Sequence, residues 1–273
     1  MMVIFPKAKI NIGLRIIDKR TDGYHDIETL FYPIGLCDAL EFVVSGGEAG
    51  KDTFTETGLC TGCDGKDNLV LRSVRKLREK YFFPYLKIHL HKKIPVGAGL
   101  GGGSSDAAFI LKNITRCYEL NITADNLKAI ALEIGSDCPF FIDAIPAFGT
   151  GRGEILIPYK NNLSGYYIVL LNPGININTT EAYRNCNLNS SSESLPELLK
   201  EPVAEWKNII NNDFEDYAFR KHPLIRSIKD DLYNCGAIFS SMSGSGSSVF
   251  GIFSKKPLIS ERISEYMIYE GLM

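Results

Sequence analysis

The sequence contains no long uncharged hydrophobic segment. The longest apolar runs are 166–171 and 139–147, and Asp143 interrupts the second, so neither approaches the roughly 18 residues that a membrane-spanning helix needs. The first residues, MMVIFPKAKINIGL, also lack the continuous apolar core of a signal peptide, because Lys7 and Lys9 divide it. We therefore expect a protein without a membrane partner and with a cytoplasmic location.

The chain has no excess of charge of either sign. Its 30 Lys and Arg residues against 32 Asp and Glu residues give a net charge of −2, so no global positive field is available to hold a nucleic acid. The seven cysteines are odd in number and scattered, which favours reduced thiols over a disulfide framework. With 45% hydrophobic and 23% charged residues, the composition is that of a globular protein rather than a disordered chain.

Strand and helix patterns mix without a regular alternation. Asp22-Gly23 predicts a tight turn between two strands, residues 46–67 suggest a loop or an irregular hairpin, and residues 237–253 suggest a strand, a loop and a strand before a terminal helix after Pro257. The remaining expected elements are strands at 9–17, 25–34, 86–90 and 166–172, and helices at 68–81, 107–118, 124–134, 195–211 and 223–234. Gly135 is expected to end the third helix. This order favours an α+β protein with two domains over one doubly wound sheet.

A glycine-rich segment lies between a predicted strand and a predicted helix. Residues 95–106, PVGAGLGGGSSD, place five glycines in seven positions. Glycine has no Cβ, so backbone N–H groups can turn inward around an anion, and the following helix N-terminus adds partial positive charge. The pattern favours a polyphosphate ligand, and we expect Gly102 to adopt a positive φ close to the phosphate. The alternative is a flexible turn without a ligand.

Two known phosphate-binding loops can be compared with this segment. A Walker A loop is excluded, because Gly103 is followed by Ser104-Ser105 rather than by Lys-Ser or Lys-Thr. Gly97, Gly99 and Gly102 satisfy the G-x-G-x-x-G spacing of a dinucleotide-binding loop, but Glu119 lies near a predicted helix end rather than after a strand. A nicotinamide enzyme therefore stays open as an alternative at this point.

The same segment resembles the second motif of the GHMP small-molecule kinases. Further segments resemble one family within that group, the 4-diphosphocytidyl-2-C-methyl-D-erythritol kinases. These segments are AKINIGL at 8–14 with RTDGYH at 20–25, GSDCP at 135–139, GTGRGE at 149–154 and SGSGSS at 243–248. They occur in this order, so the resemblance covers nearly the whole chain.

The resemblance implies an enzyme that phosphorylates a small molecule. The expected reaction is ATP-dependent phosphorylation of the 2-hydroxyl of 4-diphosphocytidyl-2-C-methyl-D-erythritol, in the non-mevalonate route to isoprenoid precursors, with Mg²⁺ bound to ATP. The expected fold has a ribosomal-S5-like domain at 1–158 and a ferredoxin-like domain at 159–273. Another GHMP kinase, such as homoserine kinase, and a non-catalytic nucleotide sensor are the alternatives; the presence of Lys9 and Asp137 disfavours the sensor.

Lys9 and Asp137 are the catalytic residues that the resemblance implies. Asp137 follows Gly135 in a predicted turn, where its carboxylate could act as a general base or a positioning acceptor. Lys9 is expected to orient Asp137 and to stabilise the transferring charge. Without the resemblance, a turn aspartate and a solvated strand lysine would be the ordinary interpretations.

The resemblance also implies two sets of binding residues. Tyr24 and Tyr183, one from each expected domain, would stack on cytosine, while His25 reads its polar edge; core packing is the alternative for these aromatic residues. Ser104 and Ser105 would bond phosphate or a Mg²⁺ shell. The complete ATP-binding set is Pro95, Gly97, Gly99, Gly101, Gly102, Gly103, Ser104, Ser105, Asn68 and Lys93. The complete substrate-binding set is Asn11, Tyr24, His25, Phe31, Thr179, Tyr183 and Gly244.

Two patterns resemble metal sites but lack enough ligands. Cys60 and Cys63 form one C-x-x-C without a second pair at zinc-site spacing. His89 and His91 share one face of a predicted strand, which is typical of the solvated side. We therefore expect no metal held by the protein alone.

Overall fold

The computed structural model describes residues 2–45, 50–59, 68–160, 163–186 and 193–273. The chain forms two compact units, each built from separate stretches of sequence. Unit 1 consists of Met1–Ala8, Leu36–Val96 and Gly101–Ile145, and unit 2 consists of Lys9–Gly35, Gly97–Leu100 and Pro146–Met273. The division into kinase domains at residue 158 stays a prediction.

Unit 1 contains a four-stranded sheet in the order β1-β4-β6-β5. The strands are β1 (Met2–Ile4), β4 (Ala39–Val44), β6 (Leu86–Lys92) and β5 (Thr53–Gly58). In β6, Leu86, Ile88 and Leu90 are buried, which confirms the predicted alternation. Residues 46–67 were expected to form a loop or an irregular hairpin, but Thr53–Gly58 pairs parallel to β6. Its polar sequence, TFTETG, gives little hydrophobic signal for a strand.

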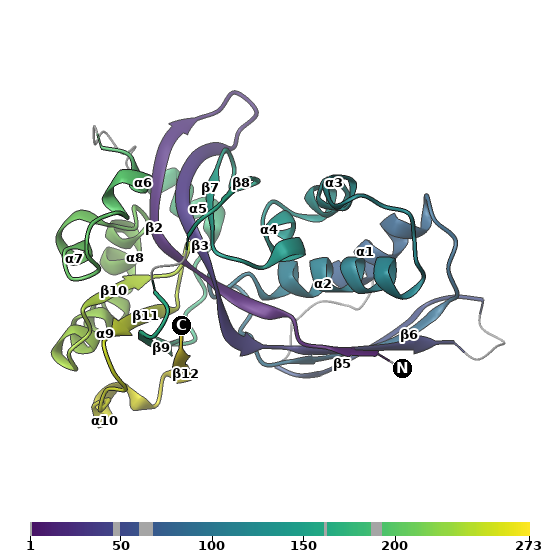
Figure 1. The fold of residues 1–273 in the computed structure, drawn as a ribbon. Coiled ribbons are helices and arrows are strands. Elements are labelled where there is room, and N and C mark those ends of the chain that lie inside the picture. The colour runs from purple at the N-terminus through teal and green to yellow at the C-terminus, as the bar shows by residue number, and fades with distance from the viewer. Residues whose placement is uncertain (1, 46–49, 60–67, 161–162, 187–192) are drawn as a thin grey trace. The chain divides into compact units, whose positions relative to one another are not determined.

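Four helices lie on one face of this sheet, as Figure 1 shows. They are α1 (Leu69–Arg78), α2 (Gly102–Cys117), α3 (Ala124–Ile134) and α4 (Cys138–Asp143). The buried stripe of α2 includes Ile110 and Leu111, with Ile114 one helical turn further on. Helix α3 has the predicted bounds. Gly135 ends it, which confirms the prediction, and has a φ of −178°, an extended conformation open to any residue rather than the left-handed one of many glycine caps.

Unit 2 contains two sheets. One has the order β2-β3-β7-β8 and the other the order β10-β11-β9-β12. The long strands β2 (Lys7–Lys19) and β3 (His25–Cys37) flank Gly23, whose φ of +86° suits glycine, and this confirms the predicted turn. The shorter strands are β7 (Ala147–Thr150), β8 (Ile155–Pro158), β9 (Tyr167–Leu171), β10 (Phe239–Met242), β11 (Val249–Phe253) and β12 (Met267–Leu272).

The helices of unit 2 are mostly short. They are α5 (Thr179–Asn185), α6 (Leu195–Leu198), α7 (Trp206–Ile209), α8 (Glu215–Lys221), α9 (Pro223–Asn234) and α10 (Glu261–Ser264). Helix α9 packs on β10 and β11 through a stripe that includes the fully buried Ile225, Ile228 and Leu232. Strands and helices of both units confirm the α+β class. In the described part of the chain, no helix is long and apolar enough to cross a membrane.

Two expected helices in unit 2 are shorter than predicted. The pattern at 195–211 forms α6 and α7, with Pro202 between them; proline has no N–H to donate and clashes with the preceding turn, so it ends a helix. The terminal helix after Pro257 is only α10, and the chain then forms β12, which pairs antiparallel with β9. A register shift between Met267 and Tyr269 interrupts the alternation that would have indicated a strand.

Candidate active site

The glycine-rich segment is a loop whose backbone requires glycine. Gly97, Gly99 and Gly101 have φ values of +66°, +77° and +68°, a region that residues with a Cβ rarely adopt. Helix α2 begins directly afterwards at Gly102, so its free N–H groups and its positive end adjoin the loop. These observations confirm the predicted order of strand, glycine loop and helix.

The Gly99 carbonyl joins three sequence motifs that are far apart in the chain. It accepts hydrogen bonds from Lys9 Nζ at 3.1 Å and from Ser243 Oγ at 2.9 Å. The Lys9 backbone N–H also donates to the carbonyl of Leu100 at 3.0 Å. A Cβ on Gly99 would lie 1.9 Å from the Ser243 carbonyl oxygen, so only glycine fits here. The loop, the first motif and the SGSGSS motif therefore form one cluster within unit 2.

Lys9 is held in a fixed orientation inside this cluster. The residue is only 4% exposed, and its ammonium donates to Asn11 Oδ1 and lies 5.3 Å from the centre of the Phe31 ring. Asn11 Nδ2 in turn donates to Thr29 Oγ1 at 2.9 Å. Asn11 and Phe31 are themselves buried and contact the Lys9 side chain. Their predicted contacts with substrate stay predictions.

Asp137 lies in unit 1, directly before α4, and is half-buried. The neighbouring Cys138 thiol hydrogen-bonds Ser104 at the start of α2, so this segment adjoins the helix that follows the glycine loop. Burial, together with the smaller effect of the negative charge of Asp137, raises the pKa of Cys138 to about 12, so the thiol stays protonated at neutral pH. The pairing of Lys9 with Asp137 stays a prediction.

The predicted base-binding aromatic residues all lie in unit 2. The rings of His25 and Tyr183 stack with centres 4.6 Å apart, and Phe214 contacts Tyr183 edge-on at 4.8 Å. Tyr24 is 52% exposed, and its ring centre lies 4.6 Å from the guanidinium of Arg152. Burial lowers the pKa of His25, and the nearby Lys19 charge lowers it further. His25 thus meets Tyr183 as a neutral ring at neutral pH.

Thr179 and Gly244 belong to the same part of unit 2. Thr179 Oγ1 lies 3.0 Å from Ser245 Oγ, which ties the start of α5 to the SGSGSS motif. Gly244 has a φ of +56°, and a Cβ there would lie 3.2 Å from Asn11 Oδ1. Both residues therefore adjoin the cluster around Lys9.

The residues predicted to bind ATP from unit 1 differ in their local roles. Asn68 Oδ1 caps α1 by accepting from the Val70 N–H at 2.9 Å. Lys93 is exposed, Pro95 and Ser104 are half-buried, and Gly103 is exposed on the first turn of α2. Ser105 is fully buried, and its hydroxyl has no hydrogen-bond partner among the described residues. A buried hydroxyl that lacks a hydrogen-bond partner in the described residues, next to the glycine loop, fits a ligand rich in acceptor oxygens.

The expectation for Gly102 is wrong. This residue starts α2 with ordinary helical backbone and has no positive φ. A Cβ on Gly102 would instead lie 2.8 Å from Ile94 Cγ2 and 3.2 Å from Lys92 Nζ. Glycine is needed here for close packing within unit 1.

Sequence reasoning missed a polar segment, Asn-Asp-Phe-Glu at 212–215, that supports the cluster. Asn212 is buried and donates from Nδ2 to the carbonyls of Met242 and Gly244, both at 2.8 Å. Glu215 accepts from the Met242 N–H at 2.8 Å, and Phe214 packs against Tyr183. The segment lies just after a pattern interpreted as one helix, so nothing local distinguished it from a loop.

Replacing Asn212 by alanine should lower the free energy of unfolding by about 1–3 kcal/mol, because two buried carbonyls lose their donor. Urea denaturation measures this change. Asn208→Ala is the matched control, since Asn208 is exposed on α7 and its replacement should change stability by less than about 0.5 kcal/mol. Equal stability of the two variants would contradict the supporting role of Asn212.

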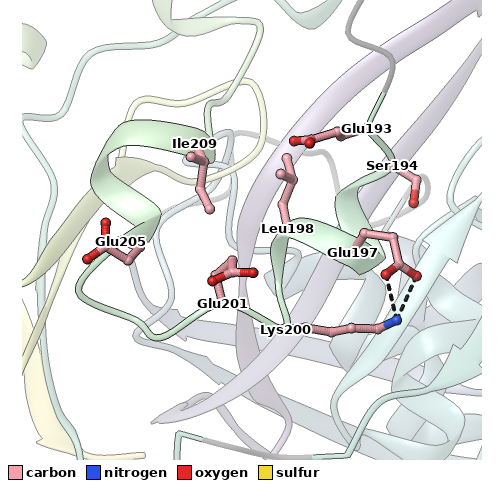
Figure 2. A pocket seen from close by; sticks show the side chains of 8 residues that line it. All are labelled: Glu193, Ser194, Glu197, Leu198, Lys200, Glu201, Glu205 and Ile209. Carbon is pink, nitrogen blue, oxygen red and sulfur yellow. Dashed lines mark hydrogen bonds and ion pairs between the residues drawn. The ribbon is translucent and has the colours of Figure 1, made fainter.

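A groove in unit 2 lies outside this cluster. Figure 2 shows it at α6 and α7, where Lys200 forms an ion pair with Glu197. Its volume is about 720 Å³. Its lining residues are Glu193, Ser194, Glu197, Leu198, Lys200, Glu201, Glu205 and Ile209. None of these is a predicted site residue, and the carboxylates would repel phosphate.

The described residues contain no group of three or more His, Cys, Asp or Glu side chains arranged to hold a metal ion. His89 Nε2 and His91 Nδ1 each lie 2.9 Å from Thr57 Oγ1 on the exposed side of β6. Cys60 and Cys63 lie outside the described residues.

Comparison with known proteins identifies the class to which this fold and loop belong. The model of the GHMP kinases N terminal domain matches residues 68–144, and that of the GHMP kinases C terminal domain matches residues 194–268. The chain is therefore a GHMP kinase, and a nicotinamide enzyme is excluded. A homoserine kinase structure from Cytophaga hutchinsonii shares the fold, with a TM-score of 0.57 at 16% identity, over 96% of this chain and 88% of that one.

Closer relatives narrow the class. A 4-diphosphocytidyl-2-C-methyl-D-erythritol kinase from Parabacteroides distasonis is 47% identical over 99% of both chains, and one from Bacteroides thetaiotaomicron is 45% identical over 95% of both. The crystal structure of a 4-(cytidine 5'-diphospho)-2C-methyl-D-erythritol kinase matches with a TM-score of 0.77 and 32% identity, over 92% of this chain and 90% of that one. The chain belongs to the 4-diphosphocytidyl-2-C-methyl-D-erythritol kinase family, which confirms the resemblance.

Proposed function

We propose that this chain transfers the γ-phosphoryl group of ATP to the 2-hydroxyl of 4-diphosphocytidyl-2-C-methyl-D-erythritol. The observation that carries the proposal is the convergence of Lys9 and Ser243 on the Gly99 carbonyl. It joins a buried lysine, a phosphate-binding loop and the SGSGSS motif in one cluster. The family supplies the acceptor, since its members are named for this substrate.

The glycine loop is the ATP phosphate site in this proposal. Backbone N–H groups around Gly97, Gly99 and Gly101 and the positive end of α2 face the phosphate oxygens. Ser104 and Ser105 donate their hydroxyls to phosphate or to water around Mg²⁺. The Ser105 hydroxyl, which has no hydrogen-bond partner in the described part of the chain, fits this role. Mg²⁺, when bound with ATP, offsets part of the phosphate charge.

Lys9 and Asp137 carry out the chemistry of the acceptor side. The carboxylate of Asp137 accepts the proton of the 2-hydroxyl while the hydroxyl oxygen attacks the γ-phosphorus. ADP leaves with the electrons of the broken P–O bond. The ammonium of Lys9, desolvated by burial, stabilises negative charge on the transferring group. These roles follow from the family resemblance, and the fixed orientation of Lys9 supports them.

The cytidine part of the acceptor binds among Tyr24, His25 and Tyr183. Stacking on tyrosine rings is available to every base, while the neutral His25 ring can hydrogen-bond the polar edge. Such charged, water-soluble substrates suit a cytoplasmic enzyme. The chain divides at residue 158 into the two kinase domains in this proposal.

An acceptor panel tests the proposal. A coupled assay of ADP release should respond to 4-diphosphocytidyl-2-C-methyl-D-erythritol and give no response with homoserine or mevalonate. ADP release with homoserine or mevalonate alone would assign the chain to another GHMP activity. Tight nucleotide binding without ADP release for any acceptor would indicate a sensor.

Replacing Tyr183 by alanine should raise KM for the cytidine conjugate by about ten-fold or more, because one stacking face contributes about 1–3 kcal/mol. KM for ATP should stay nearly constant. Tyr183→Phe keeps the ring and should match the original chain in both constants. If Tyr183→Ala lowers the melting temperature and affects both substrates alike, Tyr183 is a packing residue instead.

A further inference from the structure

A buried cluster of charges lies in unit 1 beside the glycine loop. Lys92, Asp38 and Asp106 are 2%, 1% and 2% exposed, respectively. The Lys92 ammonium donates to Asp38 Oδ2 and, at 2.8 Å, to Asp106 Oδ2. One cation thus bridges two carboxyl groups from different parts of the chain.

Asp38 fixes the backbone where the chain enters the loop. Its Oδ1 accepts the N–H groups of Lys93 at 2.5 Å and Ile94 at 2.8 Å, the last two residues before Pro95. Its own N–H donates to the Pro6 carbonyl at 3.0 Å, which ties Asp38 to the chain next to β1. The end of β6 is therefore attached to a second segment of unit 1.

Asp106 lies where the chain has left the loop, within the first turns of α2. The Lys92 ammonium also approaches the start of this helix, since it lies 3.2 Å from the position that a Cβ on Gly102 would occupy. Lys92 thereby connects both ends of the loop, through Asp38 at its entry and through Asp106 and Gly102 at its exit.

Stability alone explains this cluster poorly. Burying charges costs free energy, and well-packed apolar residues often replace a buried ion cluster without loss of stability. Burial raises the pKa of Asp106 to about 8 despite the opposing charge of Lys92, which shows how strongly this environment disfavours an ionised carboxyl. Directional bonds, unlike apolar contacts, can hold two backbone segments at one separation.

We propose that Lys92, Asp38 and Asp106 are positioning residues, which hold the two ends of the glycine loop at the separation that binding of the ATP phosphates requires. They do not contact ATP themselves. The inference rests on the proposed function only in taking this loop as the ATP site.

Asp106→Ala is the first test, and the dissociation constant for ATP, measured by calorimetry, is the readout. The expected effect is a loss of ATP affinity of about 10- to 100-fold, the scale of a misplacement of about 1 Å. Asp106→Asn should restore affinity to within about two-fold, because the amide Oδ1 can still accept from Lys92. The amide Nδ2 then takes the place of Asp106 Oδ1, which has no hydrogen-bond partner among the residues that the structure describes.

Asp52→Ala is the matched control for a purely structural effect. Asp52 is also a backbone-bonded carboxylate of unit 1, paired with Arg78 at 2.8 Å and accepting from the Leu86 N–H at the opposite end of β6. The Asp52→Ala variant should have a lower melting temperature and an unchanged affinity for ATP. If Asp106→Ala lowers the melting temperature to a similar extent and binds ATP normally, the positioning role is overturned.

A double variant keeps the test decisive if Asp106→Ala does not fold. Lys92→Met with Asp38→Asn removes the cation and its charged partner together. The substituted side chain keeps an Oδ1 that can accept from the Lys93 and Ile94 N–H groups, and burial, which raises the pKa of Asp106, keeps that carboxyl protonated at neutral pH. It should fold and still lose ATP affinity, whereas normal affinity would overturn the proposal. Calorimetry with ATP needs no acceptor, so a wrong acceptor assignment would leave this result intact and would appear only in the kinase assay.

Discussion

Replacing Asp137 by asparagine should lower kcat by about 10²- to 10⁴-fold, the usual contribution of a positioned general base. Asparagine keeps the size of the side chain but cannot accept the hydroxyl proton. Steady-state kinetics with the cytidine conjugate measures the effect, and KM for ATP should change little, since the glycine loop is intact in this variant.

Asp143→Asn is the control for this experiment. Asp143 ends the same helix, α4, but is exposed and paired with Lys128 at 2.6 Å. Its replacement should leave kcat within about two-fold, because exposed ion pairs contribute little. Near-normal turnover by a folded Asp137→Asn variant would remove the base role and leave Lys9 and substrate positioning as the sources of catalysis.

Replacing Gly99 by alanine should weaken ATP binding by about a hundred-fold or more, the scale expected when phosphate-binding groups are displaced by about 1 Å. The added Cβ would lie 1.9 Å from the Ser243 carbonyl oxygen, at a φ of +77°. Backbone must move to relieve this contact, and the bonds from Lys9 and Ser243 to the Gly99 carbonyl move with it. Calorimetry with ATP measures the loss.

Gly236→Ala is the control that separates the steric collision at Gly99 from the backbone strain of a positive φ. Gly236 has a φ of +93°, and no described residue has an atom within 4 Å of an added Cβ, so its variant carries only the strain, about 1–2 kcal/mol of stability. It should bind ATP like the original chain. Equal ATP affinity in Gly99→Ala would show that the loop is a structural turn and that the nucleotide binds elsewhere.

The parts of the fold with strong local signals could be predicted from sequence. Asp22-Gly23 identifies its turn because a tight reversal needs the freedom of glycine, and α3 begins at a Thr123 side chain that caps it. The glycine loop was predictable for the same reason, since Gly97, Gly99 and Gly101 adopt the positive φ that their residue type permits. In each case the deciding physics lies within a few residues.

Features that depend on distant segments were missed. Strand β12 exists because β9 offers it an open edge, and Asn212 matters because the carbonyls of Met242 and Gly244 lie beside it in space. Neither fact leaves a trace in neighbouring sequence. The predicted reason for glycine at position 102 was wrong because it also depends on distant atoms. Ile94 and Lys92 leave no room for a larger side chain, whereas the backbone of Gly102 itself would accept one.

Lys92 is an exception, because the sequence alone indicated that its side chain is buried. Leu86, Ile88 and Leu90 point inward from β6, and the two-residue period places Lys92 next on the same face. A lysine at an inward position requires buried partners. That inference was available from the alternation alone, although the identities of Asp38 and Asp106 were not.

Phosphorus NMR of the reaction product tests the central claim most directly. With ATP, Mg²⁺ and 4-diphosphocytidyl-2-C-methyl-D-erythritol, the account predicts ADP and one new phosphomonoester signal, with the cytidine diphosphate signals retained. This signal should be a singlet, because the carbon that bears the tertiary 2-hydroxyl carries no hydrogen. A phosphomonoester signal split by a methylene or methine proton would place the phosphoryl group on another hydroxyl. Free phosphate alone, or loss of the diphosphate signals, would contradict the transfer itself.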